Sequence, residues 1–166
     1  MNIRNYRSTD LGQCRALWTE MTQNHRDVYE DPSIGGENPG MEFDAHLAGV
    51  GQKRVWVAEE AEHVVGLVSL LPDDQQAEVE PIVISSNHRN LGIGRRLLRH
   101  AIEEAKNLGV VVLSVKPVAR NVDAIRFFHR SGFTTVGHVQ LFMWLGPSSP
   151  GQWKPGPTMF GLEFSF

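Results

Sequence analysis

The chain contains one cysteine, no excess of basic over acidic residues, and no long apolar run. A single thiol, Cys14, excludes an intrachain disulfide and a multi-thiolate metal site, and it fits a reducing compartment best. The densest apolar run, residues 109–115, is far shorter than the roughly 20 residues that cross a bilayer. The net charge of −3 argues against a nucleic-acid binder that depends on phosphate neutralisation. The histidines lack metal-ligand spacing, so we expect no metal.

The composition is that of an ordinary globular protein. With 166 residues and 41% hydrophobic residues, the chain has room for one sizeable core. Residues 1–10 carry two arginines and no apolar stretch, a pattern that does not predict a signal peptide. We therefore expect a cytoplasmic protein without a membrane partner.

The hydrophobic periodicity predicts a mixed α/β fold. A helix is expected from Leu11, followed by a loop over residues 27–40. The strand over 110–115 is nearly all apolar and should be buried on both faces. The other predicted helices cover residues 42–50, 92–107 and 121–130. The other predicted strands cover residues 2–7, 54–59, 64–71, 77–85 and 133–145.

The tail has a different composition from the rest of the chain. Residues 146–157 are rich in Gly, Pro and Ser, as in a linker. Large apolar residues then alternate with others at Phe160, Leu162, Phe164 and Phe166. This period of two predicts an extra strand, docked on this subunit or on a second copy in a homodimer.

One loop carries the strongest chemical signal. Two glycines, Gly92 and Gly94, open a strongly amphipathic helix directly after a predicted strand. The free amides of a helix start, helped by the helix dipole, bind anions such as a diphosphate. Leu97 stands where a dinucleotide fingerprint needs a small residue, and the chain has no Gly-Lys-Ser/Thr tripeptide. A plain tight turn is the alternative interpretation. Basic residues surround this helix start: His88, Arg89, Arg95, Arg96 and Arg99.

A second segment, over residues 121–133, decides between these interpretations of the loop. Arg89-Asn90-Leu91-Gly92-Ile93-Gly94 resembles the Arg/Gln-x-x-Gly-x-Gly/Ala diphosphate loop of the GNAT superfamily of N-acetyltransferases. Farther on, residues 121–133 (NVDAIRFFHRSGF) resemble that superfamily's closing segment, Asn-x-x-Ala-x-x-Phe-Tyr-x-x-x-Gly-Phe. The order of predicted elements also agrees. By this resemblance, residues 1–145 are identified as one GNAT domain, and residues 146–166 add a linker and a C-terminal strand.

The resemblance implies a fold, a co-substrate and a reaction. The fold is a mixed, mostly antiparallel sheet flanked by helices. The reaction moves the acetyl group of acetyl-CoA to a primary amine by direct attack in a ternary complex. The strand backbone would pair with pantetheine, the loop amides would hold the diphosphate, and the closing asparagine would lie near the sulfur. The residues expected to bind acetyl-CoA are Ile82, Val83, Ile84, Arg89, Asn90, Leu91, Gly92, Ile93, Gly94, Arg95, Asn121 and Phe128.

Two carboxylates are candidates for the general base. An alkylamine with a pKa of about 10.4 must lose a proton before it attacks, which costs about 4 to 5 kcal/mol at pH 7. Strand alternation predicts Glu78 and Glu80 on one face, together with Ile82 and Ile84. Members of the superfamily carry an acid at either position, and we favour Glu80. A solvated carboxylate on a strand face is the alternative.

The general acid of many superfamily members is missing. Phe128 stands where they have a tyrosine that protonates the leaving thiolate. Water, Ser85 or His129 would substitute for it. A non-catalytic module that binds acyl-CoA is therefore an alternative function.

The charge of one segment is the only feature of the sequence that bears on the identity of the acceptor. A stretch without Lys or Arg holds six acidic residues, which favours a small cationic amine such as a polyamine or an aminoglycoside-like compound. A solvated acidic loop is the other interpretation, and a protein or peptide N-terminal acetyltransferase is the rival enzyme. The acidic residues are Asp27, Glu30, Asp31, Glu37, Glu42 and Asp44.

Overall fold

A computed structural model describes residues 1–146 and 153–166 of the chain. Contacts divide the chain into two compact units, Met1–Lys116 and Pro117–Phe166, which are described one at a time. The predicted end of the GNAT domain at residue 145 is a different boundary, and it stays a prediction. Among the described residues, no helix has the length and apolar character needed to cross a membrane.

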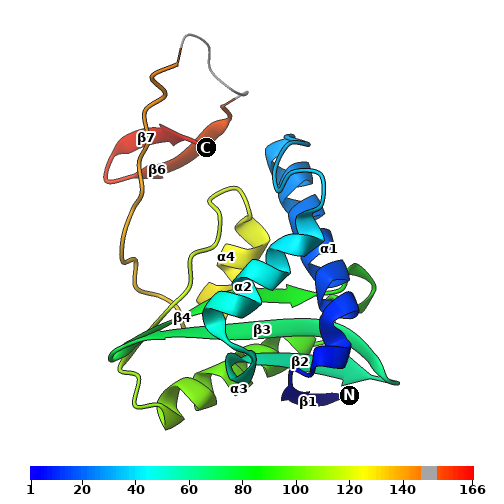
Figure 1. The fold of residues 1–166 in the computed structure, drawn as a ribbon. Helices are drawn as coiled ribbons and strands as arrows, with labels where there is room; N and C mark the ends of the chain where they lie inside the picture. The colour runs from blue at the N-terminus through cyan, green and yellow to red at the C-terminus, as the bar shows by residue number, and fades with distance from the viewer. Residues whose placement is uncertain (147–152) are drawn as a thin grey trace. The chain divides into compact units, whose positions relative to one another are not determined.

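Met1–Lys116, all of which the structure describes, form a five-stranded mixed sheet with helices on both faces (Figure 1). The strands follow the order β1–β2–β3–β4–β5, and only β4 and β5 run parallel. The predicted α/β fold class is confirmed. The strands are β1 (Asn2–Asn5), β2 (Val55–Glu60), β3 (His63–Asp73), β4 (Gln76–Ile84) and β5 (Val112–Ser114).

The helices of this unit are α1 (Leu11–Tyr29), α2 (Glu42–Val50) and α3 (Ile93–Asn107). Helices α1 and α2 pack on one face of the sheet, where Leu17 and Phe43 join a buried cluster with Leu67 of β3. Helix α3 packs on the other face, where the rings of His100 and Trp56 lie 5.2 Å apart. We call these the α1/α2 face and the α3 face.

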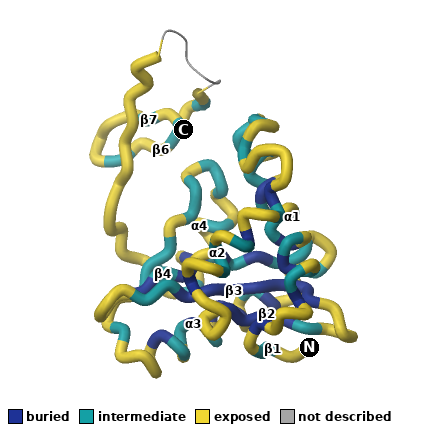
Figure 2. The backbone as a smooth tube through the Cα atoms, viewed as in Figure 1, coloured by how far each residue is buried: buried dark blue, intermediate teal, exposed yellow. Residues whose placement is uncertain are grey.

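The sheet is buried from both sides, and this makes β3 the centre of the core. Residues 64–70 of β3 are all buried, as Figure 2 shows in dark blue. Helix α1 runs into the segment predicted as loop, up to Tyr29. The Arg26 side chain, donating to the carbonyl oxygens of Ile34 (2.8 Å) and Gly36 (2.6 Å), ties the following turn to the helix.

The prediction of a fully buried strand over residues 110–115 is wrong. Strand β5 covers only Val112–Ser114, and Val111 and Val112 are 74% and 52% exposed. The physical reason is position: β5 is the last strand of the sheet and pairs only with β4. The apolar run is a short edge strand.

The second unit contains helix α4 (Val122–Arg130) and a hairpin of β6 (Pro155–Met159) and β7 (Leu162–Ser165). The predicted C-terminal strand is confirmed as β7, whose partner is β6. The linker prediction over residues 146–157 is wrong at its end, because β6 begins at Pro155. Residues 147–152 of that segment lie outside the described residues.

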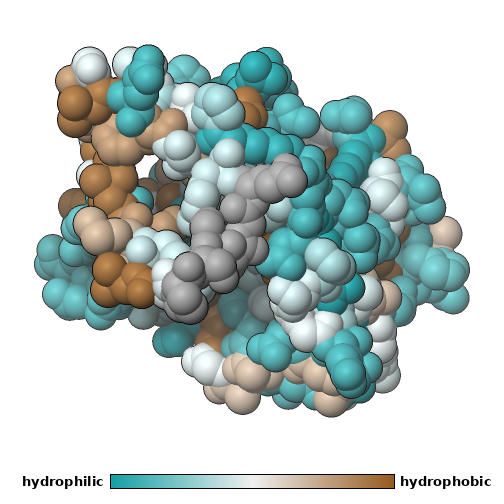
Figure 3. Space-filling model, turned by 90° about the horizontal axis from the view of Figure 1, so that it is seen from above, coloured by the Kyte–Doolittle hydropathy of each residue, from teal (hydrophilic) through white to brown (hydrophobic). Residues whose placement is uncertain are grey.

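The long strand predicted over residues 133–145 is wrong. The structure assigns no strand to these residues, and the large apolar side chains after Phe133 are exposed. A strand takes its hydrogen bonds from a neighbouring strand, and this segment has none. Figure 3 shows hydrophobic residues gathered at one side of the surface in view. The most exposed side chains of the segment are Val136, Leu141, Phe142, Met143 and Leu145.

Candidate functional site

The loop between β4 and α3 has the backbone of an anion site. Gly92 is the N-cap of α3 and has φ +78°, a left-handed conformation that favours glycine. A Cβ atom at Gly92 would meet no other atom within 4 Å, so the loop is open above it. Asn90 also has a positive φ, of 62°. The first amides of α3 therefore face open space, which suits a bulky anionic ligand.

The residue that anchors this loop, Glu20, carries no signal in the sequence. Glu20 of α1 accepts hydrogen bonds from the Ser86 amide (2.8 Å) and the Ser85 hydroxyl (3.3 Å). These contacts hold the short turn that leaves β4 before the diphosphate loop. No local motif marks Glu20, because its partners lie far along the chain.

One edge of β4 is partly free of strand pairing. Strand β5 pairs with Gln76–Glu78 only, and in this fully described unit residues 79–84 have no partner on that side. The predicted pantetheine contacts Ile82, Val83 and Ile84 all lie in this open stretch. Alternate residues of a strand turn their backbone groups to opposite edges, so the groups of this stretch that face the open edge are available for hydrogen bonds to an extended ligand. The Ile84 carbonyl oxygen also accepts from Arg89 Nε at 3.4 Å.

A bulge interrupts the pairing of β3 and β4. Glu80 and Pro81 together lie opposite a single residue of β3, Ser69. One extra residue in a strand inverts the alternation of side chains beyond it. The bulge therefore decides which side chains of β4 share a face.

The prediction that Glu78 and Glu80 share a face with Ile82 and Ile84 is wrong for this reason. Glu78 pairs with Leu71, which packs against the cluster on the α1/α2 face. Ile84, beyond the bulge, lies against the α3 face. The two carboxylates point to the α1/α2 face, away from the side chains of Ile82 and Ile84.

The two carboxylates are close but differ in environment. Glu78 Oε2 accepts a hydrogen bond from Lys116 Nζ, and its side chain is 14% exposed. Glu80 is exposed and has Glu78 as its neighbour. Loss of hydration, and then the Glu78 charge, raise the pKa of Glu80. A raised pKa makes a carboxylate a stronger base.

A histidine and a serine beside the bulge were not found from the sequence. His46 Nε2 of α2 lies 3.0 Å from the hydroxyl of Ser69, which is fully buried. The rings of His46 and Trp18 lie 5.0 Å apart. The only available signal was a serine within the apolar run of β3, and a single buried serine usually has a structural role.

Two predicted cofactor contacts belong to the second unit. The Asn121 side chain accepts a hydrogen bond from the Ala124 amide at 3.1 Å, so it is the predicted N-cap of α4. Phe128 is buried, with its ring 5.2 Å from Phe127 and 5.8 Å from Phe133. Their contact with acetyl-CoA stays a prediction.

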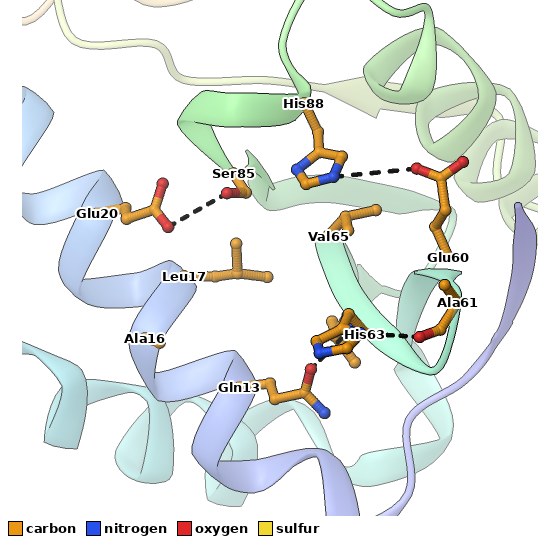
Figure 4. Close-up of a pocket in the computed structure, with 11 residues that line it drawn as sticks. Gln13, Ala16, Leu17, Glu20, Glu60, Ala61, His63, Val65, Ser85 and His88 are labelled. Carbon is orange, nitrogen blue, oxygen red and sulfur yellow. Dashed lines mark hydrogen bonds and ion pairs between the residues drawn. The ribbon is translucent and has the colours of Figure 1, made fainter.

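A cavity of about 400 Å³ lies beside α1, the β2–β3 turn and the end of β4 (Figure 4). Its polar groups largely bind one another: the Glu60 carboxylate lies 3.9 Å from His88, and Ser85 donates to Glu20. Of its lining residues, Ser85 is one of the predicted substitutes for the missing general acid, and none is a predicted base or cofactor-binding residue. Glu78 and Glu80 do not line this cavity.

The acidic segment is partly neutralised by its own neighbours. Arg15 of α1 forms an ion pair with Asp44. Asp31 accepts hydrogen bonds from the amide and hydroxyl of Ser33, and Asp27 accepts one from Gln23. Local bonds therefore use at least three of the six carboxylates.

Comparisons with known proteins agree with this architecture. N-acetyltransferase 8B of Rattus norvegicus is 30% identical over 88 residues, which are 49% of this chain and 40% of that protein. Streptothricin acetyltransferase of Streptomyces lavendulae is 33% identical over 79 residues, or 48% of this chain and 41% of that protein. The aligned part of the chain thus spans less than half the length of these relatives.

A solved structure and a family model match a larger part of the chain than these two relatives do. Ribosomal-protein-alanine N-acetyltransferase from Brucella melitensis is 27% identical with a TM-score of 0.63, covering 80% of this chain and 83% of that one. The sequence model of the Acetyltransferase (GNAT) family matches residues 14–133, which include both motifs. The chain therefore belongs to the Acetyltransferase (GNAT) family.

Proposed function

We propose that this protein is an N-acetyltransferase that moves the acetyl group of acetyl-CoA to a primary amine of a small cationic molecule. One observation carries the proposal: a single strand, β4, joins a pair of carboxylates to an anion-binding helix start. Between Glu80 and the strand end at Ile84 lies an open edge roughly 13 Å long. An extended arm between a thioester and a diphosphate matches that arrangement.

The residues present fit acetyl-CoA. The edge of β4 over residues 82–84 is not paired with β5, so its outward backbone groups are free for an extended arm. The amides after Leu91, with the open space above Gly92, suit a diphosphate. When bound, acetyl-CoA supplies an acetyl group activated as a thioester.

Glu80 is the proposed base, acting directly or through water. It is exposed to an incoming amine, whereas the neighbouring Glu78 is bonded to Lys116. Its raised pKa reduces the difference between the pKa of Glu80 and the pKa of the ammonium group that it must deprotonate. Glu78 then acts mainly by setting the charge beside the base.

The cationic acceptor is supported by charge and by one relative. Glu37 and Glu42 are exposed carboxylates in a segment without Lys or Arg. An acidic surface of this kind attracts a cation electrostatically. Streptothricin acetyltransferase, one of the similar proteins, is named for a small-molecule substrate.

A peptide acceptor is the second candidate. The similar structure from Brucella melitensis is named as a ribosomal-protein-alanine N-acetyltransferase. This fold is therefore also found in an enzyme that is named for a protein substrate. A module that binds acyl-CoA without catalysis is the third, because Phe128 has no proton to donate. The expected cytoplasmic location and homodimer rest on the sequence and stay proposals.

The test is the release of free thiol from acetyl-CoA with polyamines, aminoglycosides, amino acids and short peptides. We expect turnover with the polyamines or aminoglycosides. Turnover confined to peptides would favour the second candidate. Tight binding of acetyl-CoA without turnover on any amine would contradict an enzymatic function.

A further inference from the structure

One oxygen of the Glu78 carboxylate is buried without a hydrogen-bond donor. Glu78 Oε2 accepts a hydrogen bond from Lys116 Nζ, whereas Oε1 has no hydrogen-bond partner among the described residues. The strands on either side of Glu78 place Leu71 and Ser114 opposite it. Leu71 has no donor in its side chain, and Ser114 donates its hydroxyl hydrogen to the Ala77 carbonyl oxygen at 3.2 Å. Because a buried acceptor without a donor destabilises the fold, Oε1 is a candidate acceptor for a proton that arrives later.

The carboxyl group of Glu80 is the neighbour that can supply such a proton. Glu78 and Glu80 lie two residues apart on β4 and point to the same face of the sheet. Two ionised carboxylates have no hydrogen between them, whereas a protonated carboxyl group donates a strong hydrogen bond to an ionised one. Loss of hydration, the Glu78 charge and a hydrogen bond to Glu78 raise the pKa of Glu80, and the Lys116 charge lowers it. The protonated form of Glu80 is therefore stabilised by Glu78.

Lys116 fixes the state and the orientation of Glu78. The hydrogen bond to Glu78, and then the Glu78 and Glu80 charges, raise the pKa of Lys116, so it is a cation at every pH at which a glutamate titrates. A cation in contact with a carboxylate favours its ionised form, which is the form that accepts a hydrogen bond. Because Lys116 is bonded to Oε2, Oε1 is the oxygen that remains for Glu80. The lysine itself is 75% exposed, so its substitution should leave the core intact.

The helices that cover this face do not set the pKa of Glu80. Several of their half-buried charged or titratable groups are bonded elsewhere: Arg15, Glu20, Arg26, Asp44 and His46. The other such groups include His25, which is half-buried, and Glu42, which is exposed. In this fully described unit, no group of α1 or α2 is among those that shift the pKa of Glu80, whereas Glu78 and Lys116 both are. The environment of the proposed base is therefore made within β4 and just after β5.

We propose that Lys116 holds the Glu78 carboxylate so that Oε1 accepts a hydrogen bond from Glu80 once Glu80 has taken the acceptor's proton. This inference rests on the proposed function. Glu78 makes Glu80 a stronger base for the transfer, and Lys116 keeps Glu78 ionised. Both residues act through Glu80 and are positioning residues.

One proton passes from the substrate to the protein in each turnover. The acceptor enters as an ammonium ion and loses a proton to the ionised Glu80, whose new O–H group donates to Glu78. The amine nitrogen bonds to the acetyl carbon with its electron pair, the carbon–sulfur bond breaks, and the thiolate leaves with the electrons of that bond. The nitrogen then loses a second proton, to the thiolate or to water. Because Glu80 is exposed, it releases its own proton to water.

The first experiment measures kcat/KM against pH on the best amine of the thiol-release panel. Lys116→Met removes the cation that lowers the pKa of Glu80, so the acid limb should move to higher pH. At a given pH on that limb, kcat/KM should be roughly threefold to tenfold lower than in the wild type. Lys116→Arg keeps the charge and the donor and should keep the wild-type limb.

Another exposed lysine provides the matched control. Lys106 of α3 is likewise bonded to a glutamate, Glu103, at 2.9 Å. Lys106→Met should therefore leave the acid limb in place, although it also removes one positive charge. An acid limb that does not move in Lys116→Met, or that moves equally in Lys106→Met, would overturn the role of Lys116.

Titration of the glutamate side-chain carbons by NMR tests the shared proton without a substrate. Two carboxyl groups that share a proton titrate in two coupled steps, and both groups sense each step. The Cδ signals of Glu78 and Glu80 should therefore both move when the first proton of the pair binds. In Glu78→Gln, the Glu80 signal should titrate in one step and at lower pH. Identical titration of Glu80 in the wild type and in Glu78→Gln would overturn the shared proton.

The two measurements separate this inference from the proposed function. Turnover on an amine, with independent titration of the two carboxyl groups, would overturn the shared proton and leave the proposed function standing. Coupled titration in a protein that acetylates no amine would overturn the proposed function, and with it the use of the shared proton in catalysis.

Discussion

The two units of the chain use apolar residues in opposite ways. In Met1–Lys116, helices pack on both faces of β3 and bury it from Val64 to Leu70. In the described part of Pro117–Phe166, Phe128 is the only buried residue, and the apolar side chains of residues 136–145 are exposed. The first unit thus has a core that is covered on both sides. The second shows that an apolar strand pattern forms no strand without a partner.

The largest expected effect tests whether the first unit binds the co-substrate. Gly92→Glu places a carboxylate beside the amides of the α3 start, where it repels a diphosphate. We expect the affinity for acetyl-CoA, measured by calorimetry, to fall by at least about a hundredfold. Gly92→Asn is the control, since asparagine tolerates a positive φ and adds no charge. Wild-type affinity in Gly92→Glu would contradict the loop assignment.

A smaller effect tests whether the same unit supplies the base. Glu80→Gln should lower kcat at pH 7 by about a hundredfold and leave acetyl-CoA binding intact. Activity should recover as the pH rises, because the amine then loses its proton without help. Full activity at pH 7 would mean that the base lies elsewhere.

Substitution of the neighbouring carboxylate, Glu78, tests the direction in which the pH dependence of kcat shifts. A base must be ionised, so kcat falls as the pH drops through its pKa. The raised pKa of Glu80 puts this acid limb above the usual range of a glutamate. Glu78→Gln removes one cause, the negative charge, and should move the limb to lower pH.

The smallest effect tests whether the second unit takes part in chemistry. Asn121→Ala removes the cap of α4 and should lower the free energy of unfolding by about 1 kcal/mol, measured by denaturant titration. Asn121→Asp keeps the cap but loses the amide donor. If Asn121 also contacts acetyl-CoA, both variants bind it more weakly. If Asn121→Asp binds as wild type does, the cap is its whole role, and the contrast between the units becomes sharper.

Local features were predictable from the sequence. The start of α3 at Gly92 and the start of α4 at Asn121 depend on glycine conformation and capping, which involve only a few neighbouring residues. The bounds of α2 were predictable as well. Family membership followed from the same short segments, because their chemistry is carried by the backbone and by capping side chains.

Features that depend on pairing between distant segments were not predictable. The Glu80–Pro81 bulge exists only in relation to Ser69, and it turns Glu78 and Glu80 away from Ile82. Nothing local indicates that one serine of β3 will face one histidine of α2.

The sequence alone determined the helix starts, the glycine-rich loop before α3 and the two candidate carboxylates, because each is set by a few adjacent residues. Only the tertiary structure decided which face the carboxylates occupy and that His46 of α2 contacts Ser69, the residue of β3 opposite the bulge. It also decided that β5 is an exposed edge and that residues 133–145 form no strand. The physical reason is the same in each case: a strand's neighbours and register come from distant parts of the chain.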